Sequence, residues 1–372
     1  MEILLFVLLF MVIIGIVSGT IMFWSLNKQK RIESTNNLPF VSIIIPARDE
    51  EKRIPYLLKS LKKQNHQSYE VIVVDDGSVD ETVSVATSYG AIAIKNSIVE
   101  SMTAGKARAC ATGAEHAKGD WLLFLDADVQ FKNSDSLEIL LATYQHKGAK
   151  GIFSVQPYHE IKHSYENLSA IFNVIVITGV NVFTIWKEKI KTAGSFGPVI
   201  LTTKKDYERT GGHNQAPESI MDDFALSSIY MERGLPVTNY AGKGLITLRM
   251  YPDGVGQLME GWTKNLATAS QSTHRLVMLL IMMWINGAIM AVLFPLLALF
   301  AGEVTWILLG GIFYFVYGLH VFLLARRTGN FHAWVFILFP VLFLFFTTIF
   351  VYSLYCTHIL RSVTWKGRKI KV

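Results

Sequence analysis

The chain has 372 residues, of which 51% are hydrophobic and only 17% are charged, and its formal net charge is +6. Asp, Glu, Lys and Arg are absent from four runs that each exceed the ~20 residues needed to span a bilayer, namely 3–26, 276–302, 304–325 and 328–360. A purely soluble protein is therefore excluded. Most of the excess positive charge lies outside residues 27–275, which is typical of membrane anchoring and argues against a nucleic-acid partner.

The first apolar run is expected to be a retained membrane anchor. Acidic Glu2 stands where a signal peptide is positively charged, the run is long, and a basic cluster follows at 28–31. The positive-inside rule then places the amino terminus outside the cell and residue 27 onward in the cytoplasm. Cleavage after 17–19 is the alternative.

Strands and helices alternate in the first half of the region between the apolar runs. Hydrophobic periodicity predicts strands at 41–45, 71–74, 91–94 and 121–125, and helices at 51–63, after Asp80 and at 106–117. Alternating strands and helices imply βαβ units. The sequence therefore predicts an α/β fold with a mainly parallel sheet.

Four parts are expected along the chain. They are an N-terminal transmembrane anchor at 1–26, a cytoplasmic domain at 27–275, a C-terminal transmembrane block at 276–360 and a basic tail at 361–372. Within the cytoplasmic domain, the apolar but interrupted stretch 165–186 is expected to lie at the membrane surface and to help admit a lipid. A pair of core helices is the alternative for this stretch.

The side of the tail is ambiguous from charge alone. Basic residues at 275 and 326–327 are expected inside and Glu303 outside, which predicts four crossings and, by parity, an outer tail. The basic residues of the tail itself argue for the cytoplasm. We expect a cytoplasmic tail, because the run 328–360 contains Pro340 and is long enough to include a re-entrant or interfacial piece besides a span.

Acidic residues follow two of the predicted strands, at the edge where ligands bind in a parallel sheet. Asp75 and Asp76 follow the second strand, and Asp126 and Asp128 follow the fourth. Carboxylates gathered at one edge repel unless a cation meets them, and Mg²⁺ or Mn²⁺ prefers oxygen ligands and bridges to phosphate. In an extended chain, Asp126 and Asp128 would face the same side and one metal. Simple turns and a helix cap at Asp80 are the alternatives.

Three further segments carry candidate residues. Lys106 follows Gly105 at a helix start and could meet phosphate, or could be a solvated helix end. Asp222 and Asp223 precede an apolar helix, where they could cap it or supply a general base. His213 follows two glycines that would let its loop approach a ligand.

Together these segments resemble the inverting family 2 glycosyltransferases of the GT-A fold. The resemblance covers about 41 to 265 and rests on the motifs at 45–51, 74–80, 105–106, 126–128, 207–212 and 222–223. It implies a UDP-sugar site, a metal on Asp128 and a base at Asp222 or Asp223. The residues that it implies for binding the nucleotide sugar are Pro46, Arg48, Glu50, Asp75, Asp76, Lys106 and Asp126. His213, Trp262 and Lys264 are expected on the acceptor or diphosphate side.

A narrower resemblance points to the acceptor. Segments at 153–159, 169–173, 196–199, 249–251, 260–264 and 365–368 are similar to the bacterial carotenoid-acid glycosyltransferases. This implies an enzyme of the bacterial cell membrane that transfers one hexose, expected to be glucose, to a carotenoid carboxylic acid, giving a glucosyl ester. The alternatives are a glycolipid synthase that uses a hydroxyl of a diacylglycerol, ceramide-like or polyprenyl lipid, and a non-enzymatic subunit that binds nucleotide sugar.

One departure from the family bears on the product. Polymerising members carry Gln-x-x-Arg-Trp, whereas this chain has Gln257 to Trp262 with Gly261 directly before the tryptophan. The missing arginine disfavours polymer synthesis and favours the transfer of a single sugar.

Overall fold

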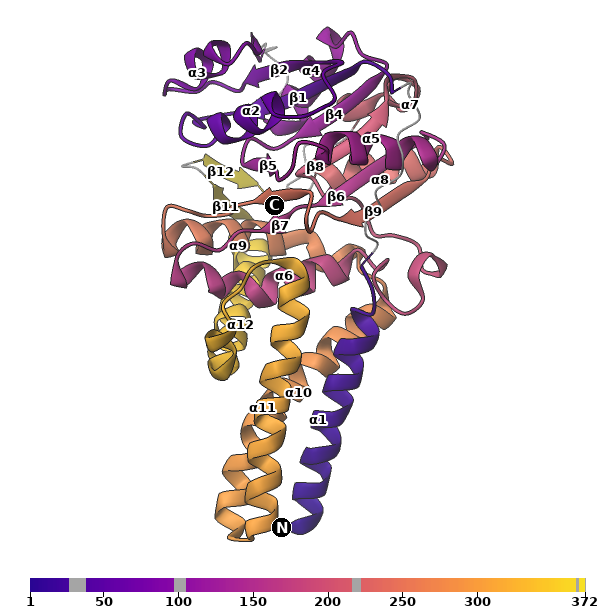
Figure 1. The fold of residues 1–372 in the computed structure, drawn as a ribbon. Helices are drawn as coiled ribbons and strands as arrows, with labels where there is room; N and C mark the ends of the chain where they lie inside the picture. Colours follow the sequence, from indigo (N-terminus) through magenta and orange to yellow (C-terminus); the bar gives the residue numbers. More distant parts are fainter. Residues whose placement is uncertain (27–37, 97–104, 216–221, 366–367, 372) are drawn as a thin grey trace. The chain divides into compact units, whose positions relative to one another are not determined.

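The computed structural model describes residues 1–26, 38–96, 105–215, 222–365 and 368–371 (Figure 1). The chain divides into two compact units. The helical unit comprises Met1–Leu26, Glu160–Ala193 and Met250–Val372, and the sheet unit comprises Asn27–His159 and Gly194–Arg249. We expected the stretch 165–186 and residues 250–275 in the cytoplasmic domain. In the structure both group with the apolar helices.

The sheet unit is built on a seven-stranded sheet. Its strand order is β3 (Ile92–Lys95), β2 (Tyr69–Asp75), β1 (Val41–Ala47), β4 (Trp121–Leu125), β8 (Val199–Thr203), β6 (Ile152–Gln156) and β9 (Val237–Ala241). The predicted strands β1 to β4 pair in parallel, as β6 and β9 do, while β8 is antiparallel to both of its neighbours. The prediction of an α/β fold with a mainly parallel sheet is confirmed.

Helices cover both faces of this sheet. They are α2 (Ile54–Lys62), α3 (Thr82–Ser88), α4 (Lys106–His116), α5 (Ser136–His146), α7 (Lys204–Thr210), η3 (Gly212–Asn214) and α8 (Asp222–Glu232). Alternate residues of β1 enter opposite cores: Ile43 packs with the core on the α2 side, and Ile44 with the core that includes α4. A β-carbon on Gly113 of α4 would lie 2.4 Å from Ile44, so glycine allows this close helix-on-sheet packing. A strand buried on both faces is typical of parallel sheets.

A smaller sheet extends the same unit. It pairs β5 (Val129–Phe131) with β10 (Ile246–Leu248) and β10 with β7 (Tyr158–His159). Because β5 begins directly after Asp128, this sheet fixes the chain on the far side of the Asp126–Asp128 turn. The turn is therefore held between two sheets.

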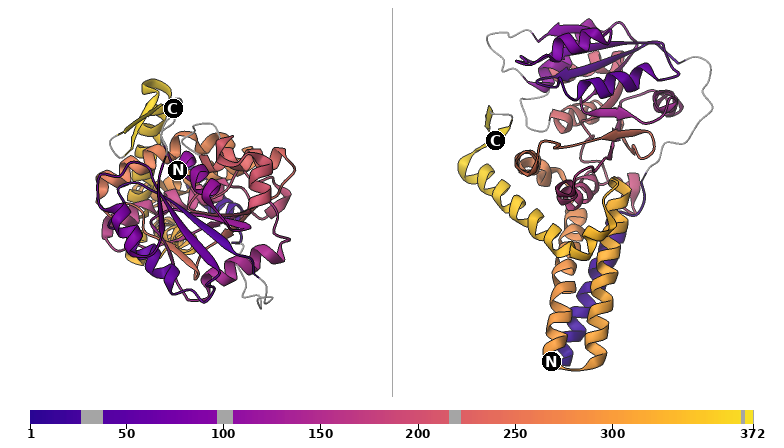
Figure 2. Two further views of the ribbon diagram at one scale, coloured as in Figure 1. Left: turned by 90° about the horizontal axis from the view of Figure 1, so that it is seen from above. Right: turned by 60° about the vertical axis from the view of Figure 1, so that its left-hand side comes forward.

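The helical unit contains helices long and apolar enough to cross a membrane. Among the described residues these are α1 (Glu2–Met22), α10 (Arg275–Ala301), α11 (Val304–Thr328) and the stretch Ala333–Leu360. That last stretch consists of η4 (Ala333–Leu338), α12 (Phe339–Tyr355) and η5 (Cys356–Leu360). Figure 2 shows α1, α10 and α11 running along one another, while α12 leaves them at an angle.

Small residues bring α1 and α10 together. A β-carbon on Gly15 would lie 2.7 Å from the α-carbon of Gly287, and the hydroxyl of Tyr317 closes the same contact from α11. That hydroxyl donates to the main-chain carbonyl of Trp284. Close backbone approach at small residues is a common way for apolar helices to associate in a membrane.

Three further helices of this unit pack against α12. They are η1 (Ser164–Ser169), α6 (Ala170–Gly179) and α9 (Val255–Ser272), while η2 (Lys187–Lys189) follows α6 along the chain. Leu342, Phe346 and Ile349 of α12 are buried, whereas Val341, Leu344, Val351 and other apolar side chains of its opposite face are exposed. After η5 the chain ends in a hairpin of β11 (Ser362–Trp365) and β12 (Arg368–Lys371).

Candidate functional site

The loop after β1 and the loop after β2 are tied together at the carboxyl edge of the sheet. The main-chain N–H of Asp49 donates to Ser78 Oγ at 3.0 Å, and Asp49 Oδ1 accepts from the N–H of Val79 at 2.9 Å. The N–H of Glu50 donates to Thr82 Oγ1 at 2.8 Å. Asp49 adopts a positive φ of 53°, which lets its side chain reach across. These bonds hold the loop that carries the predicted residues Arg48 and Glu50, while the predicted Pro46 lies at the end of β1.

Asp75 and Asp76 have different environments at the end of β2. Asp75 is buried, and its Oδ1 accepts from the N–H of Ser78, so it shapes the turn. Asp76 is half-buried, and burial raises its pKa, while Asn96 and Arg48 act in the opposite direction. Asp76 is therefore the more open carboxylate for a ligand.

Asn96 is a site residue that the sequence reasoning missed. Its Nδ2 donates to Asp76 Oδ1 at 2.8 Å, its main-chain N–H donates to the carbonyl of Asp75, and its Oδ1 accepts from Thr112. It directly follows β3, so the rule that placed the aspartates at strand ends could also have found it. Asn96 orients Asp76 by bonds to α4 and to β2.

Lys106 forms the centre of a charged cluster. Its Nζ lies 2.8 Å from Asp126 Oδ1 and 3.8 Å from Asp223 Oδ1, and it also donates to the carbonyl of Gly197 at 3.4 Å. The three side chains come from the start of α4, the end of β4 and the start of α8. The structure thus brings together three predicted residues that are far apart in the sequence.

Gly197 makes room for this cluster. A β-carbon there would lie 1.7 Å from Asp223 Oδ2, so only glycine lets the carboxylate approach the backbone. The carbonyl of Asp223 accepts from Ser195 and Ser227, which fixes the first turn of α8. The other candidate base, Asp222, begins α8, but its side chain lies outside the described residues. Asp223 is the one that the structure places beside Lys106.

The chain from Asp126 to Asp128 is a turn, so our expectation of an extended backbone there was wrong. The N–H of Val129 donates to the carbonyl of Asp126 at 3.2 Å, which folds the segment back before β5 begins. The two carboxylates therefore do not share a side through strand alternation. Asp126 pairs with Lys106, and the charges that act on Asp128 are those of Asp126, Glu50 and Arg53.

Asp128 is the carboxylate that fits a divalent cation. Its burial, followed by the charges of Asp126 and Glu50, raises its pKa to about 7, although Arg53 lowers it. A carboxylate in this environment gains from a bound cation, which removes the repulsion. Among the described residues no three His, Cys, Asp or Glu side chains converge on one point. The remaining ligands of a metal would then have to come from substrate oxygens and water, as Mg²⁺ sites often use.

His213 has a structural environment that differs from our expectation. The hydroxyl of Tyr207 forms a hydrogen bond with His213 Nδ1 at 2.9 Å and accepts from the main-chain N–H of His213, and the imidazole ring packs edge-on against Phe124. Burial, helped by Lys106, lowers its pKa to about 3. Gly211 ends α7 with a φ of 81°, and Gly212 lies under the Tyr207 ring. The two glycines serve this packing, which favours a structural role over the predicted ligand contact.

Trp262 and Lys264 both belong to α9 in the helical unit. Trp262 is buried, donates from Nε1 to Ser169 Oγ at 3.0 Å and stacks on Phe172, whereas Lys264 is half-buried. A β-carbon on Gly261 would lie 2.2 Å from the ring of Tyr251. An arginine at the position before the tryptophan therefore has no space in this packing.

Comparison with known proteins decides the family. The model of glycosyl transferase family 2 matches residues 42–194. The 4,4'-diaponeurosporenoate glycosyltransferases of Staphylococcus aureus strains MRSA252 and USA300 are each 40% identical, and each match covers 98% of this chain and 97% of the relative. The chain belongs to glycosyltransferase family 2. The predicted family is thus confirmed, with its GT-A fold and its apolar helices near both ends.

Solved structures of glycosyltransferases are more distant. A mannosyltransferase from Pyrobaculum calidifontis, in complex with GDP-Man and Mn²⁺, is 15% identical with a TM-score of 0.49, and the match covers 93% of this chain and 99% of that one. A glucosyl-3-phosphoglycerate synthase from Mycobacterium tuberculosis, with Mn²⁺ and UDP, is 17% identical with a TM-score of 0.44 over 66% and 88%.

Proposed function

We propose that this protein is a membrane-bound, inverting, non-processive hexosyltransferase that moves one glucose from a UDP-sugar to the carboxylate of a carotenoid acid. The observation that carries the proposal is the Lys106–Asp126–Asp223 cluster beside Asp128 at the carboxyl edge of the sheet. The acceptor named for the Staphylococcus relatives, which match over 98% of the chain, supports a carotenoid acid. The product would be a glucosyl ester.

The sheet unit supplies the groups that the donor requires. In the proposal, Pro46 at the end of β1, Arg48 and Glu50 in the loop that follows, and the carboxylate of Asp76 bind the uridine, with Asp75 shaping the turn. Lys106 is held by two carboxylates, and it would turn toward the diphosphate when the donor binds. A lysine ammonium near the departing phosphate stabilises the charge that develops there.

A divalent cation fits the same edge. Asp128 would hold Mg²⁺ or Mn²⁺, with Asp126 close by, and the ion would supply charge neutralisation for the leaving UDP. The position of Asp128 just beyond the carboxyl end of β4, near the like charges of Asp126 and Glu50, supports this assignment. The protein's own contribution is to hold Glu50 and Asp126 near Asp128. These three negative charges repel one another unless a cation binds, which favours cation binding.

The reaction balances as a single displacement. An oxygen of the acceptor carboxylate forms a bond to C1 of the sugar while the bond from C1 to the UDP oxygen breaks, and the UDP carries away the electron pair. The carboxylate is already ionised at neutral pH, since such acids have pKa values near ~4. No proton has to be removed, and the configuration at C1 inverts.

Two features support the transfer of one sugar at a membrane. The close packing of Gly261 against Tyr251 leaves no space for the arginine of polymerising enzymes. The four apolar stretches would keep the enzyme with a lipophilic acceptor in the bilayer. We assign the sheet unit to the cytoplasmic side, because basic residues follow the first apolar run.

The packing of α12 on α6 and α9 supports our expectation of a cytoplasmic tail. In this topology α1, α10 and α11 each cross the membrane, whereas α12 packs on α6 and α9 and does not cross. Three crossings that start from an outer amino terminus place the tail in the cytoplasm. A single cysteine at Ser362, in a chain whose Cys110 and Cys356 are replaced by serine, should then resist a membrane-impermeant maleimide on intact cells. A cysteine at Glu303 should react as the control. Labelling at position 362 would contradict this topology.

The deciding experiment tests the acceptor chemistry. Full-length protein in lipid nanodiscs receives UDP-glucose with a carotenoid acid or, separately, with a diacylglycerol, and each product is treated with mild alkali. We expect product with the acid only, and alkali should cleave it because it is an ester. An alkali-stable product would overturn the carboxylate acceptor, and the absence of UDP release with every acceptor would overturn the enzyme.

A glycolipid synthase is the second candidate, and Asp223 favours it. A lipid hydroxyl needs a general base, and Asp223 is a carboxylate held at the donor edge near Lys106. In this alternative Asp223 would accept the hydroxyl proton. The diacylglycerol arm of the same experiment distinguishes the two acceptors.

A further inference from the structure

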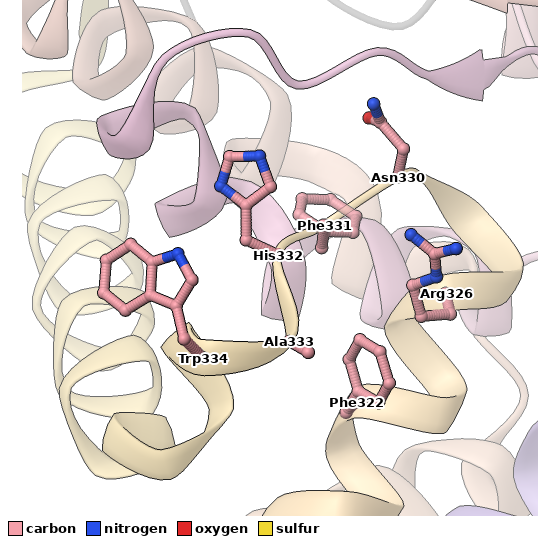
Figure 3. Close-up of a pocket in the computed structure, with 7 residues that line it drawn as sticks. All are labelled: Phe322, Arg326, Asn330, Phe331, His332, Ala333 and Trp334. Atoms are coloured by element: carbon pink, nitrogen blue, oxygen red, sulfur yellow. The ribbon is translucent and has the colours of Figure 1, made fainter.

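A pocket of about 540 Å³ lies at the carboxyl end of α11, within the helical unit. Figure 3 shows its lining, which comes from the last turns of α11, from the segment between α11 and η4, and from the first residues of η4. The side chains that matter are Phe322, Arg326, Phe331, His332 and Trp334. The proposed transfer reaction uses none of them.

The polar side chains of this lining are mainly hydrogen-bond donors. Arg326 is exposed, and its guanidinium lies 5.9 Å from the centre of the Phe322 ring. Arginine and the indole of Trp334 are donors only. Asp and Glu are absent from the lining residues.

The side-chain amide of Asn167 determines which ring nitrogen of His332 carries the hydrogen. Asn167 Nδ2 lies 3.3 Å from His332 Nδ1 and also donates to the carbonyl of Ser164 at 2.9 Å, while Asn167 Oδ1 accepts from the N–H of His332. The amide orientation is therefore fixed, and Nδ1 of a neutral His332 acts as the acceptor. The ring hydrogen then belongs on Nε2, which makes His332 a donor as well.

The remaining amide of the lining is already engaged. Asn330 Oδ1 accepts from the N–H of Ile161 at 2.6 Å, so this oxygen braces the chain before η1. The lining thus presents donors from Arg326, His332 and Trp334, next to the aromatic rings of Phe322 and Phe331. A complementary ligand carries an oxyanion on an apolar body.

We propose that this pocket binds the phosphodiester headgroup of an anionic phospholipid. Arg326 and Arg327 end the charge-free part of α11, which is where a membrane helix meets the headgroups. Arg326 and His332 bind the phosphate, and Phe322 and Trp334 contact the first carbons of the acyl chains. A carotenoid carboxylate is the other candidate, but an ion pair with arginine would lower its basicity and so weaken it as a nucleophile.

Lipid retention by the full-length protein tests this site independently of transfer. The protein is purified in neutral detergent and incubated with equal concentrations of palmitoyl-oleoyl phosphatidylglycerol and phosphatidylcholine. Native mass spectrometry then identifies the lipid that stays bound. We expect one retained phosphatidylglycerol per chain. Arg326→Gln should weaken retention at least ~10-fold, which corresponds to ~1.4 kcal/mol, Arg326→Lys should restore part of it, and His332→Phe should weaken it less.

Arg275→Gln is the matched control, because Arg275 is also an exposed arginine at the end of a membrane helix but is not in the pocket. UDP binding by each variant reports that the chain is folded. Equal loss in Arg275→Gln, retention unchanged in Arg326→Gln and His332→Phe, or no preference for the anionic lipid would each overturn the proposal. Displacement of the lipid by a stoichiometric carotenoid acid would also overturn it and assign the pocket to the acceptor.

Discussion

The sheet unit and the helical unit differ in the interactions that define them. At the carboxyl edge of the sheet, two carboxylates from distant segments, Asp126 and Asp223, each lie within 4 Å of the ammonium of Lys106. In the helical unit, the decisive contacts are between backbones, as at Gly15 and Gly287, and Arg327 donates to the main-chain carbonyls of Phe23 and Trp24. Removal of a charged group should therefore be most harmful in the sheet unit, whereas an added side-chain atom should be most harmful in the helical unit.

The largest expected effect is that of Asp128→Asn on transfer. The substitution keeps the shape and removes the charge that would hold the cation. We expect the transfer rate to fall at least ~10²-fold, the loss typical of removing one preorganised electrostatic group. Measurement of UDP release with saturating Mn²⁺ checks this. Activity within a few-fold of the unmodified protein would contradict the metal assignment and the proposed importance of charge in this unit.

The same variant offers a stability control. Asp128 has a folded pKa of about 7 and an ordinary unfolded value near ~4, so its ionised form destabilises the metal-free native state fully above pH 7. This destabilisation decreases as the pH falls from 7 to 4. Metal-free Asp128→Asn should therefore unfold at an equal or higher temperature than the unmodified protein at pH 8, with no difference near pH 4. A lower unfolding temperature at pH 8 would mean that activity was lost through misfolding.

A smaller and more informative loss is expected for Asp223→Asn. General-base assistance is typically worth ~10² to 10⁴-fold. A carboxylate acceptor does not need it, so we expect a loss below ~10²-fold, caused by the altered environment of Lys106. The transfer rate to a carotenoid acid is the measurement. A loss near 10⁴-fold would favour a hydroxyl acceptor instead.

A charge added to the helical unit should weaken binding of the lipid acceptor and leave binding of the nucleotide-sugar donor unchanged. Ile185 is 44% exposed, and it lies in the stretch that we predict to meet the membrane surface. Ile185→Asp should raise the KM for a lipid acceptor several-fold and leave UDP binding unchanged, because placing a charge among lipids is unfavourable. Val182 is only 6% exposed, so Val182→Asp is the control for core damage. Equal losses of both functions in Ile185→Asp would show that the stretch is ordinary core.

The smallest change is the addition of one methyl group. In an exposed helix, Gly→Ala gains up to ~1 kcal/mol, and Gly256 of α9 has open space around it. Gly261 of the same helix lies against Tyr251, where overpacking costs ~1–3 kcal/mol. Thermal unfolding should therefore show Gly261→Ala less stable and Gly256→Ala at least as stable as the unmodified protein. Equal effects would contradict the steric character of this unit.

The sequence was most informative where local pattern decides the structure. Hydrophobic periodicity predicted the helix at 51–63, and its periodic apolar residues Ile54, Leu57, Leu58 and Leu61 are all buried in α2. The rule for parallel strands placed Asp75 and Asp126 at one edge, because it depends only on strand direction. Asn96 obeys the same rule but lacks the charge that draws attention to an aspartate.

Features that depend on distant segments could not be predicted. The antiparallel strand β8 separates β4 from β6, and the close approach of Asp223 to Gly197 arises only from that arrangement. The tight turn at Asp126 is forced by β5, whose partner β10 lies more than a hundred residues later. Likewise, the hydropathy of 328–360 showed that this run is apolar but not that α12 would pack on α6 and α9.

The contact of Gly15 with Gly287 also sets an order of events during synthesis. Ribosomes add ~5–20 residues per second, so roughly 270 residues separate the two glycines by on the order of 10 to 50 seconds. During that interval α1 is already made, while its main partner α10 does not yet exist. The sheet unit, whose segments are translated in between, can begin to fold first. The apolar helices α10 and α11 would then be completed last, and α1 would have no α10 to pack against until that point.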